Sequence, residues 1–191
     1  YPYRGLRGDE IPENLRVVTC DSIIDYVEAN CGDKKYNYLI EVKSIGADGK
    51  RAVDKLYSII SERNLTDRTV WSTFAPDVSS YMKSDYPEIP RTADAIEAVG
   101  FYLCFALGID LKETNPSYVA LQIPYGGIIN DFIDLGSEEM LSYAHSYNIA
   151  VQYWTINEEE DVKRLTENGA DCIITDYPEM AYSVIEECKK Q

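Results

Sequence analysis

From residue 36 onward, the period of the hydrophobic positions changes repeatedly along the chain. Short apolar runs of strand length alternate with longer stretches in which apolar residues recur at helical spacing. In 49–64, for example, Val53, Leu56 and Ile60 fall on one helix face. The runs that predict strands are 36–44, 68–74, 117–125, 149–156 and 171–176, with a shorter one at 88–93.

Several of the predicted helices carry recognisable end signals. Pro76 suits the first turn of a helix that follows the second strand, and Ser137 suits the N-cap of a helix over 137–148. Asn157 with Glu160 resembles a capping box, and Gly169 suits the end of that helix. The remaining predicted helices are 19–32, 49–64, 94–109 and 178–190. The almost wholly apolar 94–109 is expected to be buried.

Strands that alternate with helices indicate an α/β fold with parallel strands joined by helical crossovers. About six strand–helix units are present, and no flexible linker separates them, so one domain is expected over 19–191 after a loop or arm over 1–18. Two architectures remain open. A doubly wound open sheet could be complete at this length, whereas a (β/α)8 TIM barrel needs eight units and about 250 residues.

The charge excludes some partners. The 191 residues carry 18 basic and 33 acidic side chains, a formal net charge of −15, which is typical of a soluble surface and disfavours non-specific binding to nucleic acids or anionic membranes. A phosphate-bearing ligand would need a local cation or a metal to offset that charge. The five cysteines are scattered, without metal-ligand spacing, which favours a reducing, cytoplasmic compartment.

Polar and aromatic residues follow the predicted strands at their carboxyl ends, where ligands bind in both architectures. Glu41 and Lys43 lie two residues apart and therefore on one side of their strand. Phe74, Gln122 and Trp154 end three further strands. These residues predict a strand-end pocket with one carboxylate, one lysine and an aromatic wall.

A structural role is open for each polar group. Glu41 could simply pair with Lys43, since a carboxylate in an apolar strand needs a partner or a metal. Trp154 could fill the core, and Asp176 could turn the chain into the last helix. His145, the only histidine, falls in the middle of a predicted helix and is expected to be a surface or packing residue.

Three motifs together resemble the glycerophosphodiester phosphodiesterase family. They are "LIEVKS" (39–44), "VWSTFAPD" (70–77) and "VQYWTIN" followed by "ENGADCIITDYPE" (151–179). Their order and spacing match across 19–185. The resemblance implies a TIM barrel that hydrolyses glycerophosphodiesters to glycerol 3-phosphate and an alcohol, with a divalent cation, calcium or magnesium, held by carboxylates.

The resemblance also assigns roles to single residues. Glu41 matches a metal-binding glutamate, and Lys43 matches the lysine beside the phosphate. Trp154 matches the tryptophan near the glycerol group, and Phe74 matches the phenylalanine of a Ser-Phe strand end, although Thr73 separates it from Ser72 here. Gln122 is added to the expected substrate-binding residues from its position at a strand end.

The catalytic part of the family pattern is absent. The family's His-Arg-Gly strand, its Glu-x-Asp pair and its second catalytic histidine have no counterparts here. The stretch 3–14 is a partial likeness of the family start, with Tyr3 at the histidine position. Only about two dozen residues separate Asn14 from Glu41, which leaves no room for the intervening elements, so we interpret that likeness as chance.

The expectation is therefore an incomplete barrel comprising strands three to eight, inactive alone and without catalytic residues of its own. Its open edges make self-association plausible. Two other interpretations stay open: a non-catalytic barrel-derived domain that binds a phosphorylated ligand or a partner protein, and a complete doubly wound domain with an unrelated substrate.

Overall fold

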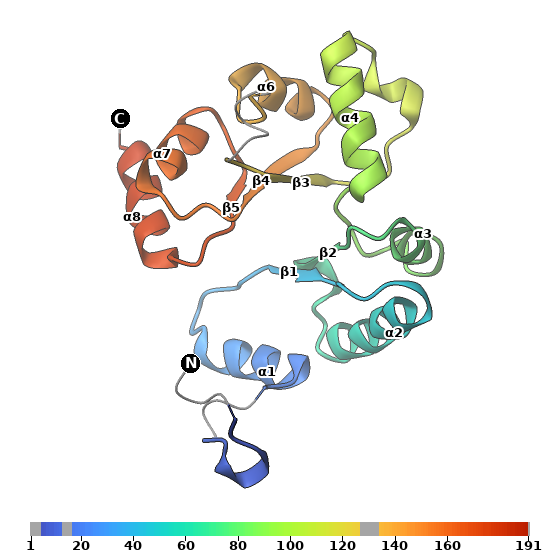
Figure 1. The fold of residues 1–191 in the computed structure, drawn as a ribbon, viewed down its shortest axis with the longest axis vertical. Coiled ribbons are helices and arrows are strands. Elements are labelled where there is room, and N and C mark those ends of the chain that lie inside the picture. Colours follow the sequence, from blue (N-terminus) through green and yellow to red (C-terminus); the bar gives the residue numbers. More distant parts are fainter. Residues whose placement is uncertain (1–4, 13–16, 127–133, 191) are drawn as a thin grey trace. The chain divides into compact units, whose positions relative to one another are not determined.

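The computed structural model describes residues 5–12, 17–126 and 134–190 (Figure 1). The chain divides into two compact units, Tyr1–Asn37 and Tyr38–Gln191. The predicted arm over 1–18 lies partly outside the described residues, at 1–4 and 13–16. Among the residues that are described, no helix is both long enough and apolar enough to cross a membrane.

The Tyr1–Asn37 unit contains the 3-10 helix η1 (Gly8–Glu10) and the helix α1 (Cys20–Asn30). Thr19 occupies the N-cap position of α1, as expected, but its hydroxyl pairs with Ser22 Oγ at 2.8 Å and caps no backbone N–H. Gly32 follows the helix with a φ of +59°, a left-handed conformation that favours glycine. The helix predicted over 19–32 is thus confirmed.

The described residues of the Tyr38–Gln191 unit form five strands, all of them parallel. They are β1 (Tyr38–Glu41), β2 (Thr69–Ser72), β3 (Ala120–Pro124), β4 (Ala150–Trp154) and β5 (Cys172–Ile173). β1 pairs with β2, and β3 pairs with β4, which pairs with β5. Each strand is shorter than the apolar run that predicted it, because the flanking residues are not paired in a ladder.

Residues Arg91 and Thr92 connect the two groups of strands. Arg91 bridges to Trp71 of β2, and Thr92 bridges to Ala120 of β3, both in parallel. Thr92 N donates to Trp71 O at 2.8 Å, and Val119 N donates to Arg91 O at 2.9 Å. The short strand predicted at 88–93 therefore exists as a bridge of two residues that joins β1–β2 to β3–β4–β5.

The order of the strands in space follows their order in the sequence. In a doubly wound sheet the order in which strands are added reverses at a switch point, whereas in a barrel each new strand is added on the same side of the previous one. Within the described ranges no strand pairs with the outer edge of β1 or of β5, so the sheet is small and unclosed. This α/β arrangement is consistent with an incomplete barrel.

Helices make the crossovers between the strands (Figure 1). They are α2 (Gly46–Glu62), α3 (Pro76–Asp85), α4 (Ala95–Leu107), α6 (Glu138–Ser146) and α7 (Glu159–Glu167), with 3-10 turns η3 (Thr66–Arg68) and η4 (Leu111–Thr114). A further helix, α8 (Pro178–Cys188), follows β5. Two end signals are confirmed: Pro76 is the first residue of α3, and the Ser137 hydroxyl accepts from Met140 N.

The capping box expected at Asn157 and Glu160 is wrong. The N-cap of α7 is Glu158, and no side chain caps that end. The Asn157 side chain is held elsewhere, because its Oδ1 accepts from Thr175 Oγ1 and from Asp176 N. The end of the helix is as expected, since Gly169 has a φ of +101° directly after the C-cap residue.

The expectation that 94–109 is a buried helix is also wrong in part. Only Phe101 and Cys104 of α4 are buried. Four apolar side chains of α4 are more than half exposed, namely Ile96, Val99, Leu103 and Leu107. Composition predicted burial on all sides, but a crossover helix packs only one face on the sheet.

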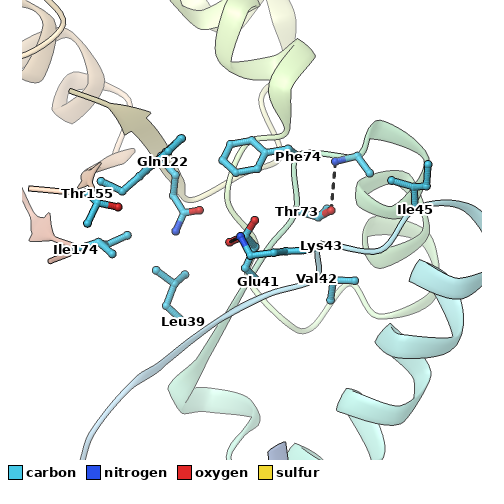
Figure 2. A pocket seen from close by; sticks show the side chains of 12 residues that line it. Leu39, Glu41, Val42, Lys43, Ile45, Thr73, Phe74, Gln122, Thr155 and Ile174 are labelled. Atoms are coloured by element: carbon cyan, nitrogen blue, oxygen red, sulfur yellow. Dashed lines mark hydrogen bonds and ion pairs between the residues drawn. The ribbon is translucent and has the colours of Figure 1, made fainter. Parts of the chain in front are cut away.

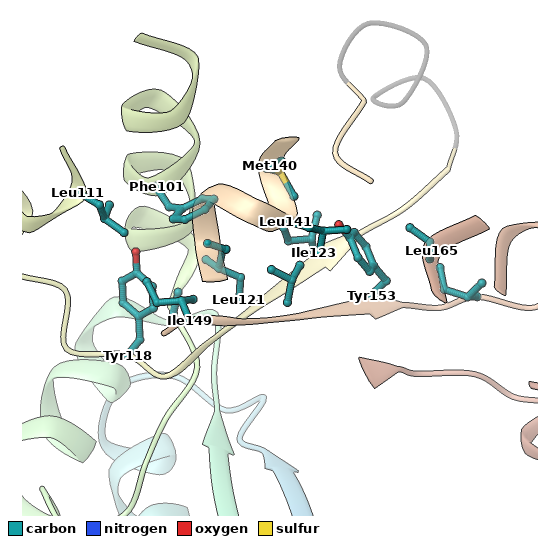
Figure 3. Packing of buried hydrophobic residues seen from close by; sticks show 14 of the residues in the cluster. Phe101, Leu111, Tyr118, Leu121, Ile123, Met140, Leu141, Ile149, Tyr153 and Leu165 are labelled. Carbon is teal, nitrogen blue, oxygen red and sulfur yellow. The ribbon is translucent and has the colours of Figure 1, made fainter. Parts of the chain in front are cut away.

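The main core of the Tyr38–Gln191 unit lies between one face of β3–β4 and the helices (Figure 3). Leu121 and Ile123 of β3 and Tyr153 of β4 belong to this core together with Phe101 and Met140 from α4 and α6. Each fully buried large side chain stabilises the fold by about 1.5–3 kcal/mol. Successive strand residues point to opposite faces, so the residues between these core positions project from the other face.

Candidate functional site

The strand ends of the Tyr38–Gln191 unit line a pocket of about 710 Å³ (Figure 2). Its walls come from β1, β3 and β4 and from the residues that follow β1, β2, β4 and β5, as expected for a parallel α/β sheet. The lining residues are Leu39, Glu41, Val42, Lys43, Ile45, Thr73, Phe74, Ala75, Gln122, Trp154, Thr155 and Ile174.

All five residues expected to bind metal or substrate line this one pocket: Glu41, Lys43, Phe74, Gln122 and Trp154. The structure therefore brings together side chains that are up to 113 positions apart, since 154 − 41 = 113. Their assigned roles remain predictions. Their shared location follows from the parallel register, which places the carboxyl ends of successive strands at one edge.

Glu41 and Lys43 form an ion pair at the end of β1. Lys43 Nζ lies 2.7 Å from Glu41 Oε2, so the pairing considered as a structural role is present. The Lys43 side chain is 81% exposed, whereas that of Glu41 is 29% exposed. An exposed pair of this kind is held by less than about 1 kcal/mol, so the ammonium group can turn toward an anionic ligand.

Phe74 and Trp154 form the aromatic wall of the pocket. Their ring centroids lie 5.7 Å apart at an interplanar angle of 57°. Phe74 is 40% exposed, so part of its ring is open to a ligand. Phe74 lies two residues after the end of β2 and Trp154 is the last residue of β4, so the two rings meet although these strands are not neighbours in the sheet.

Gln122, in the middle of β3, also lines the pocket. It is only 8% exposed, and Figure 2 shows its carboxamide directed into the pocket. Its Oε1 accepts from Ser72 Oγ at 2.5 Å, and its Nε2 donates to Gln152 Oε1 at 3.1 Å. Both sides of the amide are therefore held by residues of neighbouring segments.

Three polar residues considered above lie outside the pocket: His145, Asn157 and Asp176. His145 lies on α6, where its Nε2 is 2.8 Å from Asp171 Oδ2, and it does not line the pocket. Asn157 and Asp176 bind each other where the chain leaves β4 and β5.

Several lining residues were missed by the sequence argument, among them Leu39, Ile45 and Ile174. The signal for Leu39 was available, since it precedes Glu41 by two residues and so shares its side of β1. Ile45 follows β1 as a loop residue, and no periodic pattern marks it.

The described residues do not fit a complete site for a divalent cation. Among the residues that the structure describes, Glu41 is the only carboxylate that lines the pocket. Over 5–12, 17–126 and 134–190, no group of three or more His, Cys, Asp or Glu side chains could hold a metal ion. One carboxylate that already pairs with a lysine is too few for calcium, which takes six to eight oxygen ligands, or for octahedral magnesium.

Curated relatives cover most of this chain. The uncharacterised protein YqiK of Bacillus subtilis (strain 168) is 28% identical over 179 residues, which is 93% of this chain and 66% of YqiK. A glycerophosphodiester phosphodiesterase of Caldanaerobacter subterraneus subsp. tengcongensis is 22% identical over 188 residues, 95% of this chain and 67% of that protein. The chain spans about two thirds of the length of both relatives.

A solved structure shares the fold. The crystal structure of a putative glycerophosphoryl diester phosphodiesterase from Silicibacter pomeroyi DSS-3 superimposes with a TM-score of 0.66 at 20% identity. The superposition covers 89% of this chain and 56% of the other.

The model of the Glycerophosphoryl diester phosphodiesterase family matches residues 5–180. The match includes most of the stretch 3–14. Since the match covers nearly the whole chain and agrees with the motifs and the fold, this chain belongs to the glycerophosphoryl diester phosphodiesterase family.

Proposed function

We propose that this chain is the part of a glycerophosphodiester phosphodiesterase that comprises strands three to eight of the barrel. In the intact protein its pocket binds a glycerophosphodiester, which water cleaves at a P–O bond to give glycerol 3-phosphate and an alcohol. The observation that carries the proposal is the convergence of Lys43 with the Phe74–Trp154 pair in one strand-end pocket of a chain of this family.

The pocket offers different contacts to the phosphate and to the glycerol group of such a ligand. Lys43 supplies a mobile positive charge for the phosphate, which the net charge of −15 otherwise disfavours. The rings of Phe74 and Trp154 offer apolar faces against which the carbon skeleton of glycerol packs. Gln122 adds a hydrogen-bonding amide to the same pocket.

Proton transfer and stabilisation of the extra transition-state charge need groups other than these. His145 is the only histidine in the sequence and lies outside the pocket, and the described carboxylates do not form a metal site. A divalent cation, calcium or magnesium, would offset phosphate charge in the intact protein, with Glu41 as one of its ligands. We therefore expect the 191-residue chain alone to be inactive.

The test compares two proteins: the 191-residue chain and the protein encoded by the whole gene. Release of glycerol 3-phosphate from glycerophosphocholine is measured for each with calcium or magnesium and with a chelator. The expected result is cation-dependent release by the whole protein, its loss in Glu41→Ala, and no release by the chain alone. Release that Glu41→Ala leaves unchanged would refute the metal role of Glu41.

One observation favours a second function, a non-catalytic domain that binds a phosphorylated ligand. The described part of the chain keeps the lysine and the aromatic wall but offers one pocket carboxylate and no pocket histidine. A whole protein that binds glycerol 3-phosphate at this pocket and releases none from any glycerophosphodiester would establish this second function instead.

A further inference from the structure

The face of the sheet that bears Gln122, opposite the main core, carries a row of hydrogen-bonded polar side chains beside the pocket. Thr92 Oγ1 lies 3.1 Å from Ser72 Oγ, and Ser72 Oγ lies 2.5 Å from Gln122 Oε1. Gln122 Nε2 lies 3.1 Å from Gln152 Oε1. The four residues come from β2, the bridge segment, β3 and β4, so the row links four consecutive segments of the sheet.

The chemistry of these groups fixes the direction of each hydrogen bond in the row. A carboxamide oxygen only accepts, so the Ser72 hydroxyl must donate its single proton to Gln122. Ser72 can then only accept from the hydroxyl of Thr92. On the other side, one proton of Gln122 Nε2 is donated to Gln152.

One hydrogen-bonding group of Gln122 remains unused. Its Nε2 carries two protons, of which one is bound by Gln152, and no second acceptor is present in the described residues. Gln122 lines the pocket, and Figure 2 shows its amide directed into it. With its oxygen held by Ser72, the amide therefore presents a donor, and not an acceptor, to a bound molecule.

We propose that Ser72 and Gln152 are positioning residues that hold the Gln122 carboxamide so that its second Nε2 proton is donated to an oxygen of the bound phosphate ligand. The inference rests on the proposed function for the identity of that ligand. Ser72, Thr92 and Gln122 are all at most 8% exposed. A buried amide that could rotate would meet a phosphate oxygen with its own oxygen in some orientations, which repels the ligand.

The first measurement needs no ligand. Nuclear magnetic resonance reports the mobility of the Gln122 side-chain amide through its ¹⁵N relaxation, in the wild type and in Ser72→Ala. The amide is expected to be as rigid as the backbone in the wild type and mobile in the variant. Gln152→Leu, which removes the acceptor on the other side, is expected to act in the same direction and carries the test should Ser72→Ala not fold.

The second measurement is the affinity for glycerol 3-phosphate, followed by the same resonances. Loss of a positioned donor to a charged acceptor is expected to weaken binding about fivefold to tenfold in Ser72→Ala and in Gln152→Leu. Ser79→Ala is the matched control, because Ser79 is a serine on α3 that is only 2% exposed and lies outside the row. It should change neither the mobility of Gln122 nor the affinity.

Two results would overturn the inference: an amide that stays equally rigid in Ser72→Ala and Gln152→Leu, or an affinity that falls as much in Ser79→Ala as in them. A third result would distinguish failure of the proposed function from failure of the positioning of Gln122. If the wild-type amide is rigid, becomes mobile in the variants, and yet no protein binds glycerol 3-phosphate, the proposed ligand and the donation to it are both wrong.

Discussion

Lys43 Nζ lies 2.7 Å from Glu41 Oε2, so the cation proposed to meet the phosphate is shared with the carboxylate proposed to meet a metal. Without a metal, Glu41 competes with an anion for Lys43 and repels it. We therefore expect Glu41→Gln to bind glycerol 3-phosphate about twofold to fivefold more tightly than the wild type in the presence of a chelator. Calorimetric titration at low ionic strength measures this change.

The opposite result has a clear meaning. Unchanged or weaker binding in Glu41→Gln would show that Lys43 is not the group that meets the phosphate. Repeating the titration at high salt serves as the control, because screening should reduce the difference between the two proteins.

A second relationship concerns pH and stability. Arg91, which is 4% exposed, binds the Glu97 carboxylate through two hydrogen bonds of 2.6 and 2.7 Å. Burial raises the pKa of Glu97, but hydrogen bonds from Arg91 and from Asp94 N and the charge of Arg91 lower it more, so the pKa lies below its ordinary value of 4.5. The ionised form is thus favoured in the folded protein.

The sign of the pH effect follows from that direction. Because folding lowers the pKa of Glu97, its contribution to stability is complete above the unfolded value and is lost as the pH falls through the folded one. Glu97→Gln should flatten the fall in stability below about pH 4.5 and should cost about 3 kcal/mol at pH 7, because it leaves Arg91 buried without its counter-charge. Urea denaturation at several pH values measures both, and an unchanged slope would contradict the assignment.

Two helical glycines make a matched pair for a packing test. A Cβ at Gly49 of α2 would lie 2.5 Å from Ser44 O and from Val78 Cγ2, whereas at Gly100 of α4 it would meet nothing within 4 Å. Gly49→Ala should therefore destabilise the fold by about 1–3 kcal/mol. Gly100→Ala should stabilise it by up to about 1 kcal/mol through helix propensity. Thermal denaturation of both variants checks this, and equal effects would mean that α2 and α3 pack less closely.

Asn157 joins the chain after β4 to the chain after β5. Its Nδ2 donates to Asp176 Oδ2 at 3.0 Å, and its Oδ1 accepts from Asp176 N at 3.0 Å. Asn157→Ala should lower the free energy of unfolding by about 1–3 kcal/mol and speed hydrogen exchange at the Asp176 amide. Asn157→Asp keeps the acceptor but sets two carboxylates together, so its destabilisation should shrink below about pH 4. If the Asp176 amide exchanged its hydrogen in Asn157→Ala as slowly as in the wild type, this link would be contradicted.

The sequence was sufficient where a local period determines the structure. Alternating apolar runs and helical stretches identified the strands and crossover helices among the described residues of the Tyr38–Gln191 unit, because each kind of element has its own hydrophobic period. The location of Glu41, Lys43 and Trp154 at strand ends then followed from the topology of such sheets.

The sequence was insufficient where a contact joins distant residues. Ser72 and Gln122 are 50 positions apart, and nothing local indicates that one orients the other. Asparagine is common at helix N-caps, but the Asn157 side chain accepts hydrogen bonds from Thr175 and Asp176 and caps no helix. The exposure of Leu103 and other apolar residues of α4 depends on which face the sheet covers, which composition does not contain.

The most direct test of the central claim is a titration of the 191-residue chain with glycerol 3-phosphate, followed by the amide resonances of the pocket residues. The wild type should bind saturably, with the largest shifts at Lys43, Gln122 and Trp154, and Lys43→Met should bind about tenfold more weakly. Lys55→Met, which changes an exposed lysine of α2 outside the pocket, should bind like the wild type. Equal losses in both lysine variants, or shifts confined to other surfaces, would contradict the account.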